Sequence, residues 1–372
     1  MTKDLLTTII AKLYEVGYTV VAITCDLGPT NQKLLNELKI DSEGKTYFLH
    51  PCNEEIKINV FIDVPHLIKL LRNNFFDSGI NVNGYYISKI CLERLIQIND
   101  NDLKIVHKLS RFHLDVKGTQ RQNVKLATQI FSNTNATALE WCGKKGFIED
   151  GLEWSETAKF LRLFNDWFDL FNSSSKFGSH SGMHAYGINA EKQNELLATV
   201  SLLVKDMRVG KKNHLLPFQK GILISNRSLK NLYNDMKIMF ENTHPVIYIM
   251  TTRLNQDVVE NLFAYIRAMG ACNDRPTALD IRYRFRWYIL GKHSTDVFTD
   301  GSNTVVQDLA DNETCLTSMS DELSNNYELD YETIEDIQFC NNLEEFSEEY
   351  QTDKNIDLEE FQYSNIGKLL NL

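Results

Sequence analysis

The spacing of apolar and polar residues divides the chain into an α/β segment, a long helical block and a second α/β segment. Apolar residues at helical spacing mark a first helix that Gly17 ends: Leu5, Ile9, Leu13 and Val16. A β-branched run over 19–24 predicts a buried strand, and Asp26 stands at its carboxyl end. Thr30 is expected to cap the helix that follows. Helix, strand, acidic residue, turn and helix in this order are typical of an α/β sheet.

A second strand is predicted over 58–62, again followed by an acidic residue, Asp63. This aspartate is expected to cap a helix over 67–74, with Pro65 tolerated in the first turn. From about Val82 to Phe240 the pattern is mostly helical. The clearest helix spans 156–171 after a capping Ser155, and its aromatic stripe indicates core packing.

Short apolar strands are predicted again over 222–224 and 246–250, with a helix over 229–236 between them. Asn255 is expected to cap a further helix over 256–269, whose polar face carries Asp257 and Glu260. A sheet domain interrupted by a long helical insertion is the simplest architecture that fits this order.

The last part of the chain differs in charge. Residues 296–372 hold 20 Asp and Glu against two Lys, which leaves 37 Lys and Arg against 30 Asp and Glu in residues 1–295. A body of net charge +7 therefore carries an acidic tail, expected to be disordered or only locally helical. The basic body suits a polyanionic partner, although this signal is weak.

Length and composition predict two or three globular domains in 372 residues. The seven cysteines form no CxxC pair, which favours reduced thiols over disulfides or a zinc knuckle. No apolar run reaches the roughly 20 residues of a membrane helix, and no secretory signal is seen. No membrane association is expected, and the protein is expected to be intracellular.

Two acidic positions stand out as candidates for chemistry. Asp26 ends a buried strand, and Glu260 lies on a helix placed after the insertion. Phosphoryl transfer in DNA uses carboxylates that hold two divalent metals about 4 Å apart, and carboxylates suit Mg²⁺. The alternative is that Asp26 only caps a turn and that Glu260 is solvated. His180 and His184 could hold a metal on a helix, but Gly178 and Gly182 favour a loop there.

Several stretches resemble the P-element transposases, in the same order and over roughly residues 1–292. They are GYTVVAITCDLGPTNQKL (17–34), FIDVPHLIKLLRNNFFDSG (61–79), QNVKLATQIFSNT (122–134), FNDWFDLFN (164–172), LLPFQKGILISNRSL (215–229) and RLNQDVVENLFAYIRAMG (253–270). The last continues into DRPTALDIRYRFRWYILG (274–291).

The resemblance implies an α/β RNase H-like (integrase-like) catalytic core interrupted by a mostly α-helical GTP-binding insertion domain. On this basis the core comprises residues 1–80 and 241–293, the insertion 81–240 and the acidic tail 294–372. Asp26 matches the family's second catalytic aspartate and Glu260 its catalytic glutamate. Both would hold Mg²⁺ or Mn²⁺, whereas Asp63 is interpreted as a helix cap.

The family's first catalytic aspartate lies upstream of the strand that Asp26 follows, and this sequence begins at the helix just before that strand. The strand carrying it, the THAP DNA-binding domain and a coiled coil are therefore expected to be missing, which argues against catalysis.

For the nucleotide, the resemblance implies contacts from six residues: Lys108, Val124, Ser132, Asn165, Asp169 and Asp257. No Walker A loop is present, as in the family. Asn165 and Asp169 lie four apart on one helical face, so both can address one base edge or metal. Asn123 stands where the family's best-known member has a lysine. The alternative is that these residues are only solvated polar groups.

The leading hypothesis is a P-element-like transposase, a truncated or decayed copy, that cuts and joins DNA in the nucleus with GTP as cofactor. A homo-oligomeric assembly on DNA is implied by the family. The rival hypothesis is a non-catalytic, domesticated protein that binds GTP, DNA or a protein partner. An unrelated GTPase is disfavoured because there is no P-loop.

Overall fold

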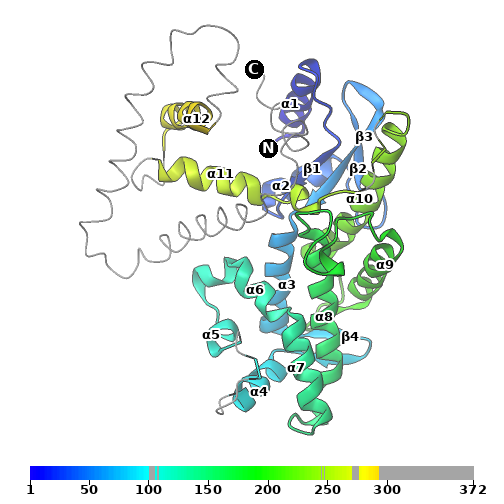
Figure 1. Ribbon diagram of the computed structural model, residues 1–372, viewed down its shortest axis with the longest axis vertical. Helices are drawn as coiled ribbons and strands as arrows, with labels where there is room; N and C mark the ends of the chain where they lie inside the picture. The colour runs from blue at the N-terminus through cyan, green and yellow to red at the C-terminus, as the bar shows by residue number, and fades with distance from the viewer. Residues whose placement is uncertain (100–104, 107–108, 244, 247, 270–275, 293–372) are drawn as a thin grey trace, which may run out of the picture. The chain divides into compact units, whose positions relative to one another are not determined.

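The computed structural model describes residues 1–99, 105–106, 109–243, 245–246, 248–269 and 276–292 (Figure 1). The chain divides into two compact units, Met1–Leu262 and Phe263–Leu372, and each is described by itself. The acidic segment 294–372, predicted to be disordered or locally helical, lies outside the described residues.

The first unit opens with the predicted helix, strand and helix. Helix α1 (Lys3–Glu15) is capped by Thr2, and Gly17 follows it with a φ of +92°. Strand β1 (Ala22–Cys25) confirms the predicted strand. Helix α2 (Pro29–Glu37) has Gly28 as its cap, so the assignment of Thr30 as the cap was wrong. The reason is Pro29, whose fixed φ and missing N–H suit the first helical position.

A three-stranded sheet with the order β1-β3-β2 holds the predicted strands. Strand β3 (Asn53–Ile62) lies in the centre, parallel to β1 and antiparallel to β2 (Tyr47–His50). The register pairs Cys25 with Ile62, so β1 and β3 end side by side. Because parallel strands present their carboxyl ends at one edge of a sheet, the residues that follow both strands come together there.

Two long helices flank this sheet. Helix α3 (Val64–Ser78) runs from the end of β3 into the helical part of the unit (Figure 1). Helix α10 (Pro217–Met239) packs on β3, and the hydroxyl of Ser225 accepts a hydrogen bond from the Ile62 amide over 3.0 Å. The predicted strand over 222–224 was therefore wrong, because these residues are the buried face of α10. A short apolar run does not distinguish a strand from a buried helix.

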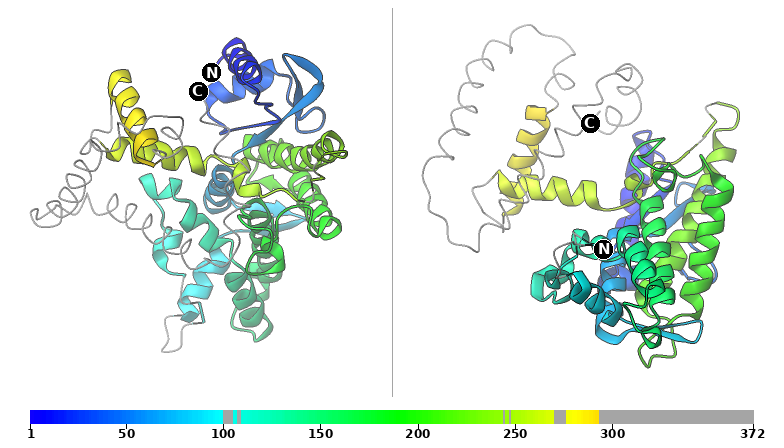
Figure 2. Two further views of the ribbon diagram at one scale, coloured as in Figure 1. Left: turned by 45° about the horizontal axis from the view of Figure 1, so that its top comes forward. Right: turned by 60° about the horizontal axis from the view of Figure 1, so that its bottom comes forward.

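Between α3 and α10 the chain is mostly helical, as predicted. Its longer helices pack side by side, with close α7–α8, α8–α9 and α9–α10 neighbours (Figure 2). The elements are α4 (Ile90–Asn99), α5 (Arg111–Leu114), η1 (Gly118–Gln122), α6 (Val124–Ile130), α7 (Asn133–Lys144), η2 (Asp150–Leu152), α8 (Trp154–Phe171), η3 (Ser181–Met183) and α9 (Ala190–Asp206).

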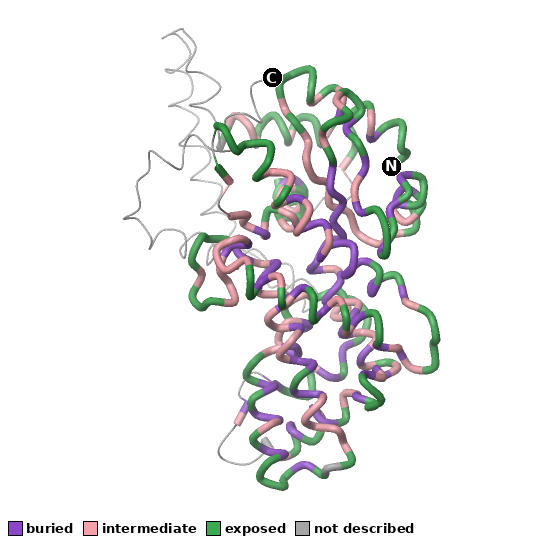
Figure 3. Tube along the Cα trace, turned by 90° about the vertical axis from the view of Figure 1, so that its right-hand side faces the viewer, coloured by how far each residue is buried: buried purple, intermediate pink, exposed green. Residues whose placement is uncertain are grey.

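Helix α8 confirms the clearest helix of the sequence, but Ser155 does not cap it. Glu153 precedes the helix in a left-handed conformation, and Ser155 lies within the first turn. The aromatic stripe is core, as predicted: the rings of Phe160 and Phe164 lie 4.8 Å apart, and Trp167 is fully buried. Buried positions continue from the sheet into these helices as one core (Figure 3).

A second, small sheet was not predicted. It has the order β5-β4-β6 and consists of β4 (Ile80–Val82), β5 (Tyr85–Ile87) and β6 (Arg208–Val209). Over 246–250, the described residues form no strand, and Ile249 makes only an isolated antiparallel bridge to Tyr186. The predicted strand there was wrong, because without a longer partner strand the pairing stops after one bridge.

The chain then forms η4 (Thr251–Leu254), α11 (Asp257–Ala268) and α12 (Ala278–Lys292). Asn255 acts as the expected cap of α11, since its side chain accepts a hydrogen bond from the Asp257 amide over 3.2 Å. Among the helices described, none combines the length and apolar character that crossing a bilayer requires. The sheet and the helical block match the predicted order, while the domain boundaries and the RNase H-like class stay predictions.

Candidate functional site

The ends of β1 and β3 bring two aspartates together. Asp26 follows β1 directly and Asp63 follows β3, and the amide of Asp63 donates to the carbonyl of Cys25 over 2.9 Å. Burial, with Asp26 and then Asp63 adding their negative charge, raises the pKa of the Cys25 thiol to about 12. The carboxylates of Asp26 and Asp63 therefore concentrate negative charge at the carboxyl ends of β1 and β3.

Asp63 is a structural carboxylate, as predicted. Its Oδ2 accepts from the His66 amide and its Oδ1 from the Gln256 amide, both over 2.9 Å, and the residue is 3% exposed. The first bond caps α3, and the second ties the segment before α11 to the end of β3. Both oxygens therefore accept backbone amides, and these two bonds fix the orientation of the carboxylate.

Asp26 presents one free oxygen. Its Oδ1 accepts from the Gly28 amide over 2.8 Å and from Asn31 Nδ2 over 2.7 Å. These bonds, the Gly28 amide first, lower the pKa of Asp26, and the nearby side chains of His66 and Lys69 act in the same direction. Within the described residues Oδ2 accepts no hydrogen bond, so an ionised carboxylate has one oxygen available for a ligand.

Helix α11 adds two carboxylates near these strand ends. Burial, followed by the charges of Asp63 and Glu260, raises the pKa of Asp257. Asn255 Nδ2 donates to Asp257 Oδ2 over 3.1 Å, whereas Glu260 is exposed. The structure therefore groups Asp257 with the strand-end carboxylates, and no described contact joins it to Asn165.

Sequence reasoning missed a histidine and a lysine of this site. His66 and Lys69 lie three residues apart in the first turns of α3, and both belong to the stretch FIDVPHLIKL that carried the resemblance. Burial, and then the charge of Lys69, lowers the pKa of His66, while Asp26, Asp63 and Glu260 oppose this. Their position directly after a strand-end aspartate was the signal that could have identified them.

Asp26 and Glu260, from two different elements, both act on the pKa of His66. Their convergence on a metal ion stays a prediction, because no three His, Cys, Asp or Glu side chains come together as a metal-binding cluster among the residues described. The donor chemistry fits a hard divalent ion, since carboxylate oxygens are the ligands that Mg²⁺ and Mn²⁺ prefer. Two protein ligands leave the remaining positions of an octahedral ion to water or other donors.

The candidate nucleotide residues of α8 lie side by side. Asn165 Nδ2 donates to Asp169 Oδ2 over 2.9 Å, and His180 Nε2 lies 3.7 Å from the same oxygen. Burial raises the pKa of Asp169, and Asp166 adds to this, while His180 and Asn165 oppose it. His180 and His184 flank η3 in a loop, as expected, rather than sharing a helix face.

Val124 and Ser132 stand at two helix starts. Val124 is the first residue of α6, and Ser132 caps α7, with its hydroxyl accepting from the Asn135 amide over 3.3 Å. Phe131 lies 6.1 Å from Phe164, ring to ring, so the start of α7 packs beside the middle of α8. Asn123 caps α6, and the predicted residue Lys108 lies outside the described residues.

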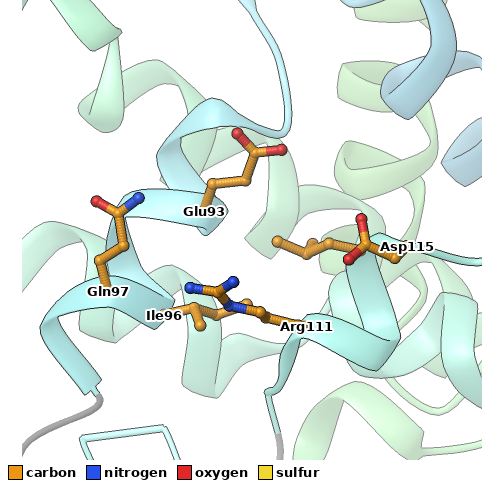
Figure 4. Close-up of a pocket in the computed structure, with 6 residues that line it drawn as sticks. Glu93, Ile96, Gln97, Arg111 and Asp115 are labelled. Atoms are coloured by element: carbon orange, nitrogen blue, oxygen red, sulfur yellow. The ribbon is translucent and has the colours of Figure 1, made fainter.

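Two hollows lie in the helical part, and neither was predicted. One, of about 230 Å³, lies between α4 and α5, where Glu93, Arg111 and Asp115 surround an open polar space (Figure 4). The other follows the first turns of α7 and includes Asn133 and Trp141. Neither hollow is lined by a predicted nucleotide residue, although Asn133 in the second directly follows Ser132 in the sequence.

Comparisons with known proteins identify a matching domain family and two similar proteins. Residues 65–184 match the family described as the TNP-like, GTP-binding insertion domain. The chain is 44% identical over 294 residues to the transposable element P transposase of Drosophila melanogaster, covering 78% of this chain and 38% of the relative. It is 27% identical over 302 residues to the human DNA transposase THAP9, covering 76% of this chain and 33% of that protein.

A solved structure, the Drosophila P element transposase strand transfer complex, matches with a TM-score of 0.72 and 42% identity. The match covers 79% of this chain and 65% of the chain in the complex. This chain therefore spans less than two thirds of each of these proteins. It is homologous to the P-element-type DNA transposases and contains their TNP-like, GTP-binding insertion domain.

Proposed function

We propose that the chain is a P-element-like transposase polypeptide, with an RNase H-like core that transfers phosphoryl groups in DNA and an insertion that binds GTP as a cofactor. The observation that carries the proposal is the 44% identity over 294 residues to the Drosophila melanogaster P transposase. The names of the relatives, transposases and a strand transfer complex, support DNA as the substrate and, with it, a nuclear location. Assembly into a homo-oligomer is proposed from the family resemblance alone.

Asp26 and Glu260 are the residues proposed to hold Mg²⁺ or Mn²⁺. A bound ion of this kind supplies charge neutralisation at a phosphoryl group and activation of the attacking oxygen. Asp26 contributes its free Oδ2, and its lowered pKa keeps it ionised. Asp63 has a structural role: its two oxygens accept hydrogen bonds from the His66 amide at the start of α3 and from the Gln256 amide just before α11.

Asn165 and Asp169 are proposed to contact the guanine base. Guanine presents N–H donors on its pairing edge, and a carboxylate with two acceptor oxygens complements them, whereas adenine lacks the same donors there. Asp169 is half-buried, so a hydrogen bond to it excludes water and gains strength. Val124, Ser132, Lys108 and Asp257 are proposed to complete the nucleotide contacts.

Mn²⁺ binding tests the metal site without requiring DNA cleavage. Electron paramagnetic resonance of the full chain measures free Mn²⁺, and Asp26→Asn and Glu260→Gln are each expected to weaken binding at least about tenfold, as loss of a ligand or its support does. Asp206→Asn, an exposed carboxyl at the end of α9, is the matched control and should bind as the unaltered chain does. Equal binding by all the variants would refute the assignment.

A further inference from the structure

Helix α12 presents two chemically different sides. One side packs on α11: Arg284 Nη1 donates to the carbonyls of Ile266 and Arg267 over 3.2 and 3.3 Å, and the rings of Tyr288 and Tyr265 lie 5.4 Å apart. The helix thus docks on the end of its neighbour through an arginine that satisfies the last carbonyls of α11.

The other side is exposed, basic and aromatic. At helical spacing, Arg282 and Arg286 form one row and Tyr283 and Trp287 the adjacent row. Tyr283 is 49% exposed and Trp287 66% exposed, and the guanidinium of Arg282 lies 5.8 Å from the ring centre of Tyr283. We call these four residues the basic aromatic face.

The face lacks the partners that its chemistry favours. Neither Arg282 nor Arg286 forms an ion pair among the described residues. Asp280, the acidic residue of the same helix, is instead hydrogen-bonded to Thr277. Exposed aromatics beside unpaired guanidinium groups mark an interaction surface, and the complementary partner carries both acidic and aromatic groups.

This chain itself contains such a partner. The 80 residues after Lys292 include 20 Asp and Glu against two Lys, and aromatic residues stand among the carboxylates, as in the run over 339–350. The segment is joined directly to α12, and a tethered ligand acts at an effective concentration of roughly millimolar. Free nucleic acid shares the negative charge but has no such tether.

We propose that the acidic segment 293–372 docks on the basic aromatic face of α12 within the same chain. Carboxylates pair with Arg282 and Arg286, and aromatic side chains pack against Tyr283 and Trp287. Because the contact is largely electrostatic, it is strongest at low salt. It is independent of the proposed metal and nucleotide sites, because all four residues lie on α12.

The test is limited proteolysis of the full chain by a glutamate-specific protease, with cleavage after Glu344, Glu345, Glu348 and Glu349 followed by mass spectrometry. Docking predicts that Arg282→Gln with Arg286→Gln speeds this cleavage at least about fivefold, and that high salt speeds it similarly in the unaltered chain. The matched control, Lys211→Gln with Lys212→Gln, removes two exposed charges elsewhere and should leave the rate unchanged.

A second readout protects the test against misfolding of the variant. Quenching of Trp287 fluorescence by acrylamide, isolated by comparison with Trp287→Phe, should increase once the segment has been cleaved from the unaltered protein. Equal cleavage rates in all variants and at both salt concentrations would overturn the proposal. Protection of Trp287 by an added DNA duplex, with no protection before its addition, would overturn it in favour of a nucleic-acid surface.

Discussion

At the scale of single residues, the half-buried carboxyl of Asp169 couples stability to pH. Burial raises its pKa in the folded chain, so the folded state holds this proton more tightly than the unfolded state. The stability that it contributes is present at low pH and is lost as pH rises from the ordinary value through the raised value. Asp169→Asn should therefore raise the melting temperature at neutral pH but not at acidic pH, as calorimetry at both values can measure. A variant that is less stable at neutral pH would contradict this.

The reactivity of the Cys25 thiol depends on its burial and on the negative charge at the strand ends. With a pKa of about 12, its thiol should react with iodoacetamide at pH 8 at least about a hundredfold more slowly than the exposed Cys52, since the thiolate is the nucleophile. Mass spectrometry of labelled peptides gives both rates. Asp26→Asn removes one cause of the shift and should speed the labelling of Cys25. Equal rates at both thiols in the native chain would refute this description.

Asp63 should behave as a scaffold residue. Asp63→Ala removes the cap of α3, worth about 1–2 kcal/mol, and leaves the Gln256 amide without its acceptor, worth about 1–3 kcal/mol. We expect the free energy of unfolding in urea to fall by roughly 2–4 kcal/mol. Glu195→Ala, an exposed substitution on α9, should change it by less than about 0.5 kcal/mol. If Asp63→Ala changed the free energy of unfolding by a similarly small amount, the two hydrogen bonds of Asp63 would not stabilise the fold.

At the scale of elements, the sequence predicted those helices and strands whose formation depends on neighbouring residues in the chain. β1, β3, α3 and α8 were found because periodicity, caps and strand-end residues mark them. The predicted strand over 222–224 was wrong because only the packing of α10 on β3 shows that this run is the buried face of a helix. The short strands β4, β5 and β6 leave no pattern in two or three residues, and β6 pairs with β4 from a distant part of the sequence.

The α7–α8 pair makes a prediction of its own, because it frames the nucleotide residues. A methyl group at Gly143 of α7 would overlap the indole ring of Trp154 on α8. Gly143→Ala should therefore lower the free energy of unfolding by about 1–3 kcal/mol, despite the better helix propensity of alanine. Gly291→Ala on α12 meets no atom within 4 Å and should be neutral or stabilising by at most about 1 kcal/mol. If chemical denaturation gave equal changes in the free energy of unfolding for both variants, Gly143 and the Trp154 ring would not lie in close contact.

At the scale of the whole molecule, the candidate sites came from resemblance more than from pattern. Periodicity alone placed Asp26 at a strand end and Glu260 on a later helix, but it left their roles open. Sequence could not show that Asp257 lies with the strand-end carboxylates, because this depends on the bond between Asp63 and Gln256 across 193 residues. His66 and Lys69 were missed for the same reason, since their function depends on what faces them.

This transposase homologue is proposed to bind GTP through its insertion, and isothermal titration of the full chain with GTP and with ATP measures that binding. We expect GTP to bind at least about tenfold more tightly than ATP, and Asp169→Asn to remove the difference, because a hydrogen bond to a charged group contributes about 1.5–3 kcal/mol. Absence of GTP binding at millimolar nucleotide in the folded chain, or equal affinity for the two nucleotides, would contradict it.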